Sequence, residues 1–197
     1  MLSYAPWYLE SSRYYTGVSI VVFSSEECDK IRNQLLETKL FEAKVNVGDN
    51  SLVDNQYRNT NAVSLDPFNE STRWIFQRIN DAILHVNKTY FELDIISLQT
   101  LQFLEYNVGQ FYKTHVDSLD IAPKNEFRKI SLSIQLTDPK NYKGGDLHLY
   151  CEDPPNVCEK EKGLGIFFPS YLPHEVLPVT EGVRHCLVGW VTGPKWR

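Results

Sequence analysis

The sequence predicts a mainly β protein with supporting helices, whose core is a double-stranded β-helix, or jelly roll. Two observations favour this class. The first 90 residues contain two stretches whose apolar residues recur at helical spacing. From residue 95 onward, short runs rich in β-branched and aromatic residues alternate with turn sequences, which is typical of antiparallel strands. A helical portion followed by many short strands indicates a barrel supported by helices.

The chain of 197 residues has the length of one domain, with 42% hydrophobic residues. We expect residues 1–90 to supply helical support and the first strands, and residues 95–192 to form the jelly-roll core. A net charge of −5 and a pI near 5.5 disfavour binding to nucleic acid or to an anionic membrane. The sequence shows neither a signal-peptide pattern nor an apolar run long enough to cross a membrane, so we expect a cytoplasmic protein.

Two helices are expected before residue 95. The Ser-Ser-Glu-Glu sequence at residues 24–27 is typical of a helix N-terminus, and an apolar stripe continues to about residue 38. The second helix, residues 70–89, has the stronger helical spacing of apolar residues: Trp74, Ile75, Ile79, Ala82, Ile83 and Val86. Residues 46–56 are polar without a clear period, and we expect a loop there.

The expected strands after residue 95 are LQTLQFLEY, FYKTHVD, RKISLSIQLTD, DLHLYC, GLGIFFP, HEVLPV and RHCLVGWV. The expected turns between them are DPKNYKGG, EDPPN and PVTEG. The strand after Arg128 alternates clearly, with apolar residues on one face and Ser131, Ser133 and Gln135 on the other. We expect the apolar face to contact the helices and the small polar face to look into the barrel, where a jelly roll has room for a ligand.

The four cysteines are Cys28, Cys151, Cys158 and Cys186, and they follow no CxxC pattern. Free thiols are expected in a reducing cytosol. Cys151 and Cys158 flank the loop EDPPNV and could form a bridge if oxidised.

Two histidines and an aspartate have the pattern of a metal site. His115 and Asp117 form a His-x-Asp pair, whose side chains would point the same way on a strand, and His174 begins another expected strand. Two imidazoles and one carboxylate are the facial triad of non-haem Fe(II) oxygenases. Arg184 would be costly to bury in a barrel without a carboxylate partner, and a dicarboxylate such as 2-oxoglutarate supplies one.

The other histidines are His85, His148 and His185, which lack such partners in the sequence pattern and are expected to be structural or solvated.

Residues 106–117, YNVGQFYKTHVD, look like the Y-x-x-G-Q-x-Y-x-x-H-x-D signature of the Fe(II)- and 2-oxoglutarate-dependent oxygenases, in their prolyl 4-hydroxylase-like branch. The sequences RKISLSIQL, GGDL, FPSYLPHEV and GVR resemble later parts of the same pattern. The end of the chain, PVTEGVRHCLVGWVTGP, is also similar to small bacteriophage oxygenases, so the host cytoplasm of a phage is a further expected location. The resemblance covers residues 95–192 and implies the cupin-like jelly roll.

By this resemblance, His115, Asp117 and His174 bind Fe(II) and carry catalysis, and Arg184 binds the distal carboxylate of 2-oxoglutarate. Tyr106 matches a tyrosine that touches the co-substrate, and the positions matching the substrate entrance are Tyr112, Arg128 and Trp190. Many prolyl 4-hydroxylases have Lys where Arg184 stands, which weakens the assignment to proline but not the reaction class.

The resemblance implies a dioxygenase that hydroxylates a substrate C–H bond, foremost a prolyl residue of a peptide or protein. It would use Fe(II), 2-oxoglutarate and O₂, with ascorbate as a candidate reductant, and release succinate and CO₂. The alternatives are a hydroxylase of a free amino acid or small metabolite, and a jelly-roll binding module without catalysis. Asp117 disfavours a halogenase, and the lack of a basic face disfavours an alkylation-repair demethylase. Residues 46–56 and 118–127 are candidate lid loops.

Overall fold

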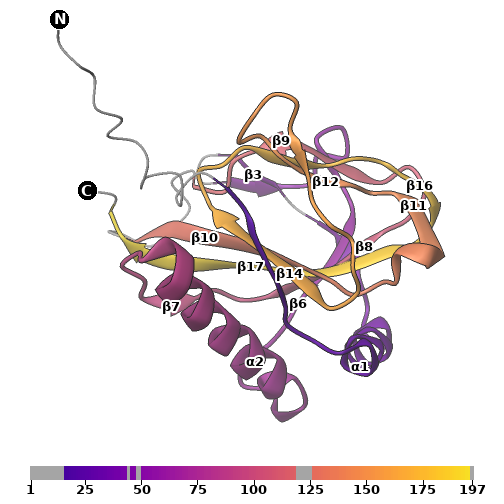
Figure 1. The fold of residues 1–197 in the computed structure, drawn as a ribbon. Helices are drawn as coiled ribbons and strands as arrows, with labels where there is room; N and C mark the ends of the chain where they lie inside the picture. Colours follow the sequence, from indigo (N-terminus) through magenta and orange to yellow (C-terminus); the bar gives the residue numbers. More distant parts are fainter. Residues whose placement is uncertain (1–15, 44, 48–49, 119–125, 196–197) are drawn as a thin grey trace, which may run out of the picture.

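Two antiparallel β-sheets face each other, and two helices cover the outer face of the larger sheet (Figure 1). The computed structural model describes residues 16–43, 45–47, 50–118 and 126–195, with no side-chain description for residues 44–52. This arrangement is the jelly roll that the sequence predicts.

The larger sheet has the strand order β1-β14-β10-β17-β8-β6-β2, with β7 pairing to β17. Its strands are β1 (Val18–Val21), β14 (Leu164–Pro169), β10 (Glu126–Gln135), β17 (Arg184–Pro194), β8 (Gln102–Tyr106), β6 (Asn61–Ser64), β2 (Phe41–Glu42) and β7 (Ser97–Leu98). The two longest strands, β10 and β17, pair along most of their length and form the centre of the sheet.

The smaller sheet has the order β13-β12-β15-β9-β5. Its strands are β13 (Asn156–Val157), β12 (Leu147–Leu149), β15 (His174–Val176), β9 (Phe111–His115) and β5 (Arg58–Asn59). All of its pairings are antiparallel.

Two short two-stranded sheets form where a turn and a loop were predicted. The PVTEG segment, expected as a turn, contains β16 (Val179–Gly182), because β11 (Tyr142–Gly144) is available to accept its ladder bonds. Within residues 46–56, expected as a loop, β3 (Val45–Val47) pairs with β4 (Asn50–Leu52). The other candidate lid, residues 118–127, lies largely outside the described residues.

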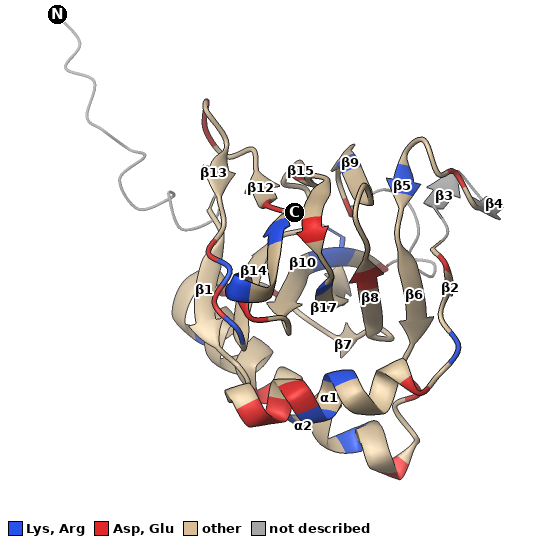
Figure 2. Ribbon diagram, turned by 90° about the vertical axis from the view of Figure 1, so that its right-hand side faces the viewer, with Lys and Arg blue, Asp and Glu red and all other residues tan. Residues whose placement is uncertain are grey.

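Both predicted helices are present on the same side of the larger sheet (Figure 2). Helix α1 (Ser25–Leu36) starts with a capping box in which the Ser24 hydroxyl accepts from the Glu27 N–H, and the Glu27 carboxylate accepts from the Ser24 N–H. Helix α2 (Glu70–Val86) continues into a π-helical turn, η2 (Asn87–Phe91). A short 3₁₀ turn, η3 (Pro139–Asn141), precedes β11.

The interior has two apolar clusters, one between the helices and the larger sheet and one between the two sheets. Strand β10 lies between these two clusters, as the alternation of apolar and polar residues along it predicts. Ile130 and Ile134 belong to the helix-side cluster, whereas Ser131 and Ser133 lie on the opposite face of the strand, toward the space between the sheets. The four cysteines are free thiols, and no helix in the described part of the chain is long and apolar enough to cross a membrane.

Candidate metal centre

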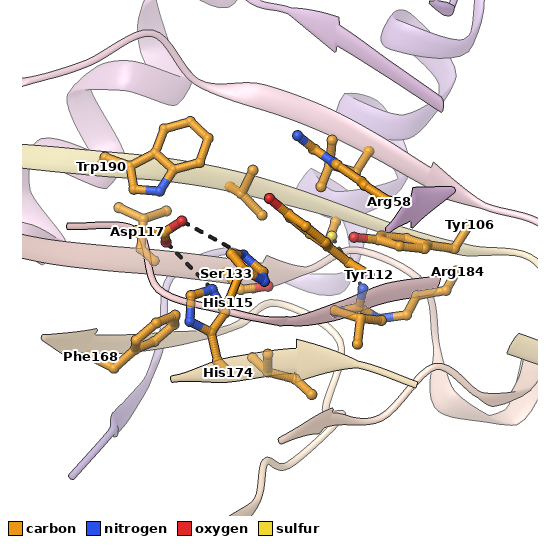
Figure 3. Close-up of a pocket in the computed structure, with 16 residues that line it drawn as sticks. Arg58, Tyr106, Tyr112, His115, Asp117, Ser133, Phe168, His174, Arg184 and Trp190 are labelled. Carbon is orange, nitrogen blue, oxygen red and sulfur yellow. Dashed lines mark hydrogen bonds and ion pairs between the residues drawn. The ribbon is translucent and has the colours of Figure 1, made fainter. Parts of the chain in front are cut away.

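The two histidines of the predicted triad meet on neighbouring strands of the smaller sheet. His115 ends β9, His174 begins β15, and the two are direct partners in the strand register. One possible ligand atom from each of His115, Asp117 and His174 lies within 4.8 Å of the other two. Asp117 Oδ1 is 3.7 Å from His115 Nε2, and Asp117 Oδ2 is 3.4 Å from His174 Nε2 (Figure 3). The structure thus brings together the three residues that the sequence singles out.

Asp117 reaches the cluster by a different route from the one predicted. Strand β9 ends at His115, so Asp117 lies on a bend beyond the strand and not on its face. Its backbone N–H donates to the Ser170 carbonyl at 2.9 Å, and its Oδ2 accepts from the Ser131 hydroxyl at 2.7 Å. The alternation rule therefore predicted that Asp117 lies near His115, but a bend and these hydrogen bonds place it there, and not a shared strand face.

Both imidazoles are oriented by backbone carbonyls. The Nδ1 atom of His115 lies 2.8 Å from the Lys113 carbonyl oxygen, and that of His174 lies 3.0 Å from the Leu172 carbonyl oxygen. Because a carbonyl can only accept, Nδ1 carries the hydrogen in each ring, and the Nε2 lone pair faces the cluster. This is the form of histidine that coordinates a metal.

The charge states also suit a metal ion. Burial, together with the nearby His174, lowers the pKa of His115 to about 3, so its imidazole is neutral at pH 7. Burial opposes ionisation of Asp117, but the two imidazoles and the Ser131 hydroxyl lower the pKa of its carboxyl, which is therefore ionised. Two imidazole nitrogens and one carboxylate are a donor set that fits Fe(II).

The cluster opens into a cavity between the two sheets. The triad lies toward one end of this cavity and Arg184 toward the other, with Tyr112 between them (Figure 3). Leucine and valine side chains complete much of the wall, so the space is largely apolar apart from these few polar groups.

Arg184 is a buried cation whose described neighbours include no carboxylate at ion-pair distance. Its side chain is only 3% exposed at the start of β17. The guanidinium carbon lies 5.3 Å from the ring centroid of Tyr106, and Nη1 lies 3.4 Å from Cys186 Sγ. Burial raises the pKa of Tyr106 to about 12, so its hydroxyl is neutral. A buried guanidinium in this setting is stabilised by a bound carboxylate, as 2-oxoglutarate would provide.

The three residues expected at the substrate entrance occupy different places. Tyr112 and Trp190 line the cavity. Arg128 stacks on Trp190, with its guanidinium carbon 3.9 Å from the ring centroid, and its Nε donates to Gln99 Oε1 at 2.9 Å. Arg128 therefore borders the site through the Trp190 ring.

Arg58 is a cavity residue that the sequence did not reveal. It lies on β5 and is 6% exposed, and its guanidinium carbon is 4.8 Å from the Tyr112 ring centroid. Its Nη2 donates to Gln102 Oε1 at 3.4 Å. The two-residue strand β5 pairs with β9 beside Tyr112, and this contact between residues 54 positions apart leaves no local pattern.

The remaining histidines lie outside the cluster, as expected. His85 is exposed on α2, and His148 lies 3.4 Å from the Glu175 carboxylate on the smaller sheet. His185 is buried on the face of β17 opposite Arg184, 3.3 Å from the Glu105 carboxylate.

The model of the 2OG-Fe(II) oxygenase superfamily matches residues 101–192. A PKHD-type hydroxylase of Aliarcobacter butzleri is 31% identical over 177 residues, which cover 86% of this chain and 75% of that protein. A PKHD-type hydroxylase of Rippkaea orientalis is 35% identical over 95 residues, which cover 48% of this chain. The chain spans about half the length of the first two curated relatives it matches, 43% and 52%.

The fold is shared with solved structures. A prolyl-4-hydroxylase of Pseudomonas putida superposes with a TM-score of 0.71 at 20% sequence identity, covering 91% of this chain and 93% of that one. At this level of identity the similarity establishes the double-stranded β-helix fold.

Proposed function

This chain belongs to the 2OG-Fe(II) oxygenase superfamily, and we propose that it is a dioxygenase that hydroxylates a C–H bond of a prolyl residue in a peptide or protein. The observation that carries the proposal is one cavity holding both a His-Asp-His cluster and a buried arginine with no carboxylate partner among the described residues. When bound, Fe(II) and 2-oxoglutarate would use O₂ to hydroxylate the substrate, with succinate and CO₂ as co-products.

Each part of the site has a defined task. The Nε2 atoms of His115 and His174 and the Asp117 carboxylate would hold Fe(II) on one side, leaving the cavity side open to ligands. Arg184 would bind the distal carboxylate of 2-oxoglutarate in a bidentate manner, beside the Tyr106 ring. The apolar wall between the two sheets would exclude water from the reacting atoms.

Two observations support a prolyl substrate. The aromatic rings of Tyr112 and Trp190 line the cavity, and flat aromatic faces suit the apolar pyrrolidine ring. Solved structures with the same fold include enzymes named as prolyl hydroxylases. Ascorbate would serve only to keep the iron reduced.

A free amino acid or small metabolite is the second candidate substrate class. Arg58 places a second buried guanidinium on the cavity wall, and a free α-carboxylate would suit it. A non-catalytic binding module is the third candidate.

Succinate formation and substrate mass distinguish the candidates. The protein with Fe(II), 2-oxoglutarate and O₂ is offered proline-containing peptides, the same peptides with alanine for proline, and free amino acids. We expect succinate to form, and we expect the proline-containing peptides, but not the alanine peptides or the free amino acids, to gain one oxygen atom. Oxygen added only to free amino acids supports the second class. If succinate never exceeds the level of His174→Ala, the oxygenase proposal fails.

A further inference from the structure

The pairing of β9 does not fix the Asp117 carboxylate. The strand ends at His115, and Asp117 follows on a bend two residues later. The two histidines, in contrast, lie on paired strands, and each ring is held by a carbonyl two residues before it. Asp117 is nevertheless buried, with only 8% of its surface exposed, and it lies close to both imidazoles. Contacts outside its own strand must therefore hold it.

Ser131 supplies the first such contact, from the opposite sheet. It lies within β10, paired with Phe168 of β14 on one side and Trp190 of β17 on the other, and is 1% exposed. Its hydroxyl lies 2.7 Å from Asp117 Oδ2 and 3.0 Å from Ser170 Oγ. A hydrogen bond to a carboxylate at this distance is short and charge-assisted. The position of the carboxylate is thereby tied to the central strand of the larger sheet.

Ser170 supplies the second contact. The Ser131 hydroxyl, which donates to Asp117, also lies 3.0 Å from Ser170 Oγ, and the Ser170 oxygen is placed to accept from it. The Ser170 carbonyl also accepts from the Asp117 N–H at 2.9 Å, and the Ser170 N–H donates to the Lys129 carbonyl at 3.0 Å. Ser170 is fully buried. Asp117 is thus held at its backbone and at its side chain by one connected group.

We propose, on the basis of the iron site proposed above, that Ser131 is a positioning residue for the metal centre and that Ser170 supports it. The Ser131 hydroxyl fixes the orientation of the Asp117 carboxylate and occupies Oδ2. A metal held by Asp117 would then be bound chiefly through Oδ1, the oxygen to which Ser131 does not donate, and this would leave open positions for co-substrate and O₂. Without the hydroxyl, the carboxylate is free to rotate and to present both oxygens to the metal.

Cobalt binding tests this proposal without relying on activity. Co(II) replaces Fe(II), calorimetry gives its Kd, and the visible d–d spectrum reports the coordination number. Ser131→Ala is expected to raise the Kd by about 10–100-fold and to weaken the d–d band, because a bidentate carboxylate raises the coordination number. Ser131→Thr keeps the hydroxyl and is expected to have the wild-type Kd for Co(II) and the wild-type d–d band. Ser133→Ala is the matched control for metal binding alone, because Ser133 shares the strand and face but makes no hydrogen bond to Asp117 in the described part of the chain.

Folding is checked by circular dichroism before metal is added. A Ser131→Ala protein with the wild-type Kd and spectrum overturns the positioning role. If Ser131→Ala does not fold, Ser170→Ala replaces it, since it removes only the supporting hydroxyl. Its expected Kd increase is smaller, about threefold to tenfold, and an unchanged Kd and spectrum there also overturn the proposal. Failure of the wild-type protein to bind Co(II) overturns the iron site itself, which is a distinguishable result.

Discussion

The imidazole of His115 lies against the face of the Tyr112 ring, with the ring centroids 3.6 Å apart and the planes inclined by 18°. The guanidinium of Arg58 lies 4.8 Å from the same Tyr112 ring. Tyr112 therefore forms part of the wall of the candidate metal centre, in addition to lining the cavity where a substrate would enter. The ring, more than the hydroxyl, makes these contacts.

Replacement of Tyr112 should separate the two parts of its side chain. Tyr112→Phe keeps the ring and is expected to retain metal affinity within about twofold. Tyr112→Ala removes the stacked ring, and since such aromatic pairs contribute about 0.5–1.5 kcal/mol, metal binding should weaken by roughly 2–13-fold. Calorimetric titration with Co(II) measures both variants. Equal affinities of the Phe and Ala variants would show that the ring does not support His115.

Arg184 should affect stability and co-substrate binding in opposite directions. Arg184→Met removes a buried charge that no carboxylate of the described residues pairs with, so the free energy of unfolding without ligand should rise by about 1 kcal/mol or more. Binding of 2-oxoglutarate should weaken by about 30-fold or more, equivalent to about 2 kcal/mol. Arg184→Lys keeps the charge but not the bidentate geometry, so its affinity for 2-oxoglutarate should lie between that of the wild-type protein and that of the Met variant. Urea unfolding and 2-oxoglutarate titration give the two quantities; loss of stability in the Met variant would contradict this account.

Metal removal should destabilise the wild-type protein but not the His174→Ala variant. Metal at about 100 times its Kd stabilises the folded state by about 2.7 kcal/mol, which corresponds to a Tm increase of roughly 5–10 °C for a protein of this size. A chelator should reverse that increase. His174→Ala lacks one of the three proposed ligands and should melt at one temperature with and without metal. An equal metal-dependent shift in this variant would place the metal elsewhere.

Several features of the fold follow directly from local sequence. The capping box at Ser24 and the apolar stripes fix the two helices, and the alternation around Ser131 assigns the two faces of β10. The His115–Asp117–His174 cluster and the buried Arg184 were also readable, because those residue types at that spacing serve a specific chemistry.

Other features depend on contacts between distant residues. Strand β16 forms because β11, about 40 residues earlier, pairs with it, whereas Pro178 and Gly182 at the two ends of the local PVTEG sequence are typical of a turn. The contact of Arg58 with Tyr112 likewise joins separate strands, and the hydrogen bond from Ser131 to Asp117 joins β10 to the bend after β9. Register between strands determines the first two contacts. The packing of the two sheets determines the third, and sequence periodicity reports neither.

His185 should make stability depend on pH. It is buried beside Phe103, with Arg32 Nε 3.3 Å from its Nδ1 and Glu105 Oε2 3.3 Å from its Nε2. Burial lowers its pKa below the ordinary 6.5, although Glu105 opposes this shift. The unfolded chain therefore binds a proton near pH 6.5 that the folded protein does not bind. The stability contributed by neutral His185 is complete above that pH and is lost as the pH falls.

The test compares urea unfolding at pH 7.5, 6.5 and 5.5. The wild-type protein should lose more free energy of unfolding on acidification than His185→Gln, which has no titrating group at this position. His85→Gln, at an exposed site on α2, is the control and should follow the wild-type slope. If the free energy of unfolding fell equally with pH in the wild-type protein and in His185→Gln, the folded state would not resist protonation of His185.

The most direct test of the iron and 2-oxoglutarate site is an anaerobic titration of 2-oxoglutarate into the Fe(II)-loaded protein, followed by visible absorption. Chelation of the iron by 2-oxoglutarate produces a metal-to-ligand charge-transfer band. We predict a saturable band in the wild-type protein, no band in His174→Ala, and a band that needs far more 2-oxoglutarate in Arg184→Ala. Absence of the band in folded, iron-loaded wild-type protein would contradict the site and leave a binding module as the function of the jelly roll.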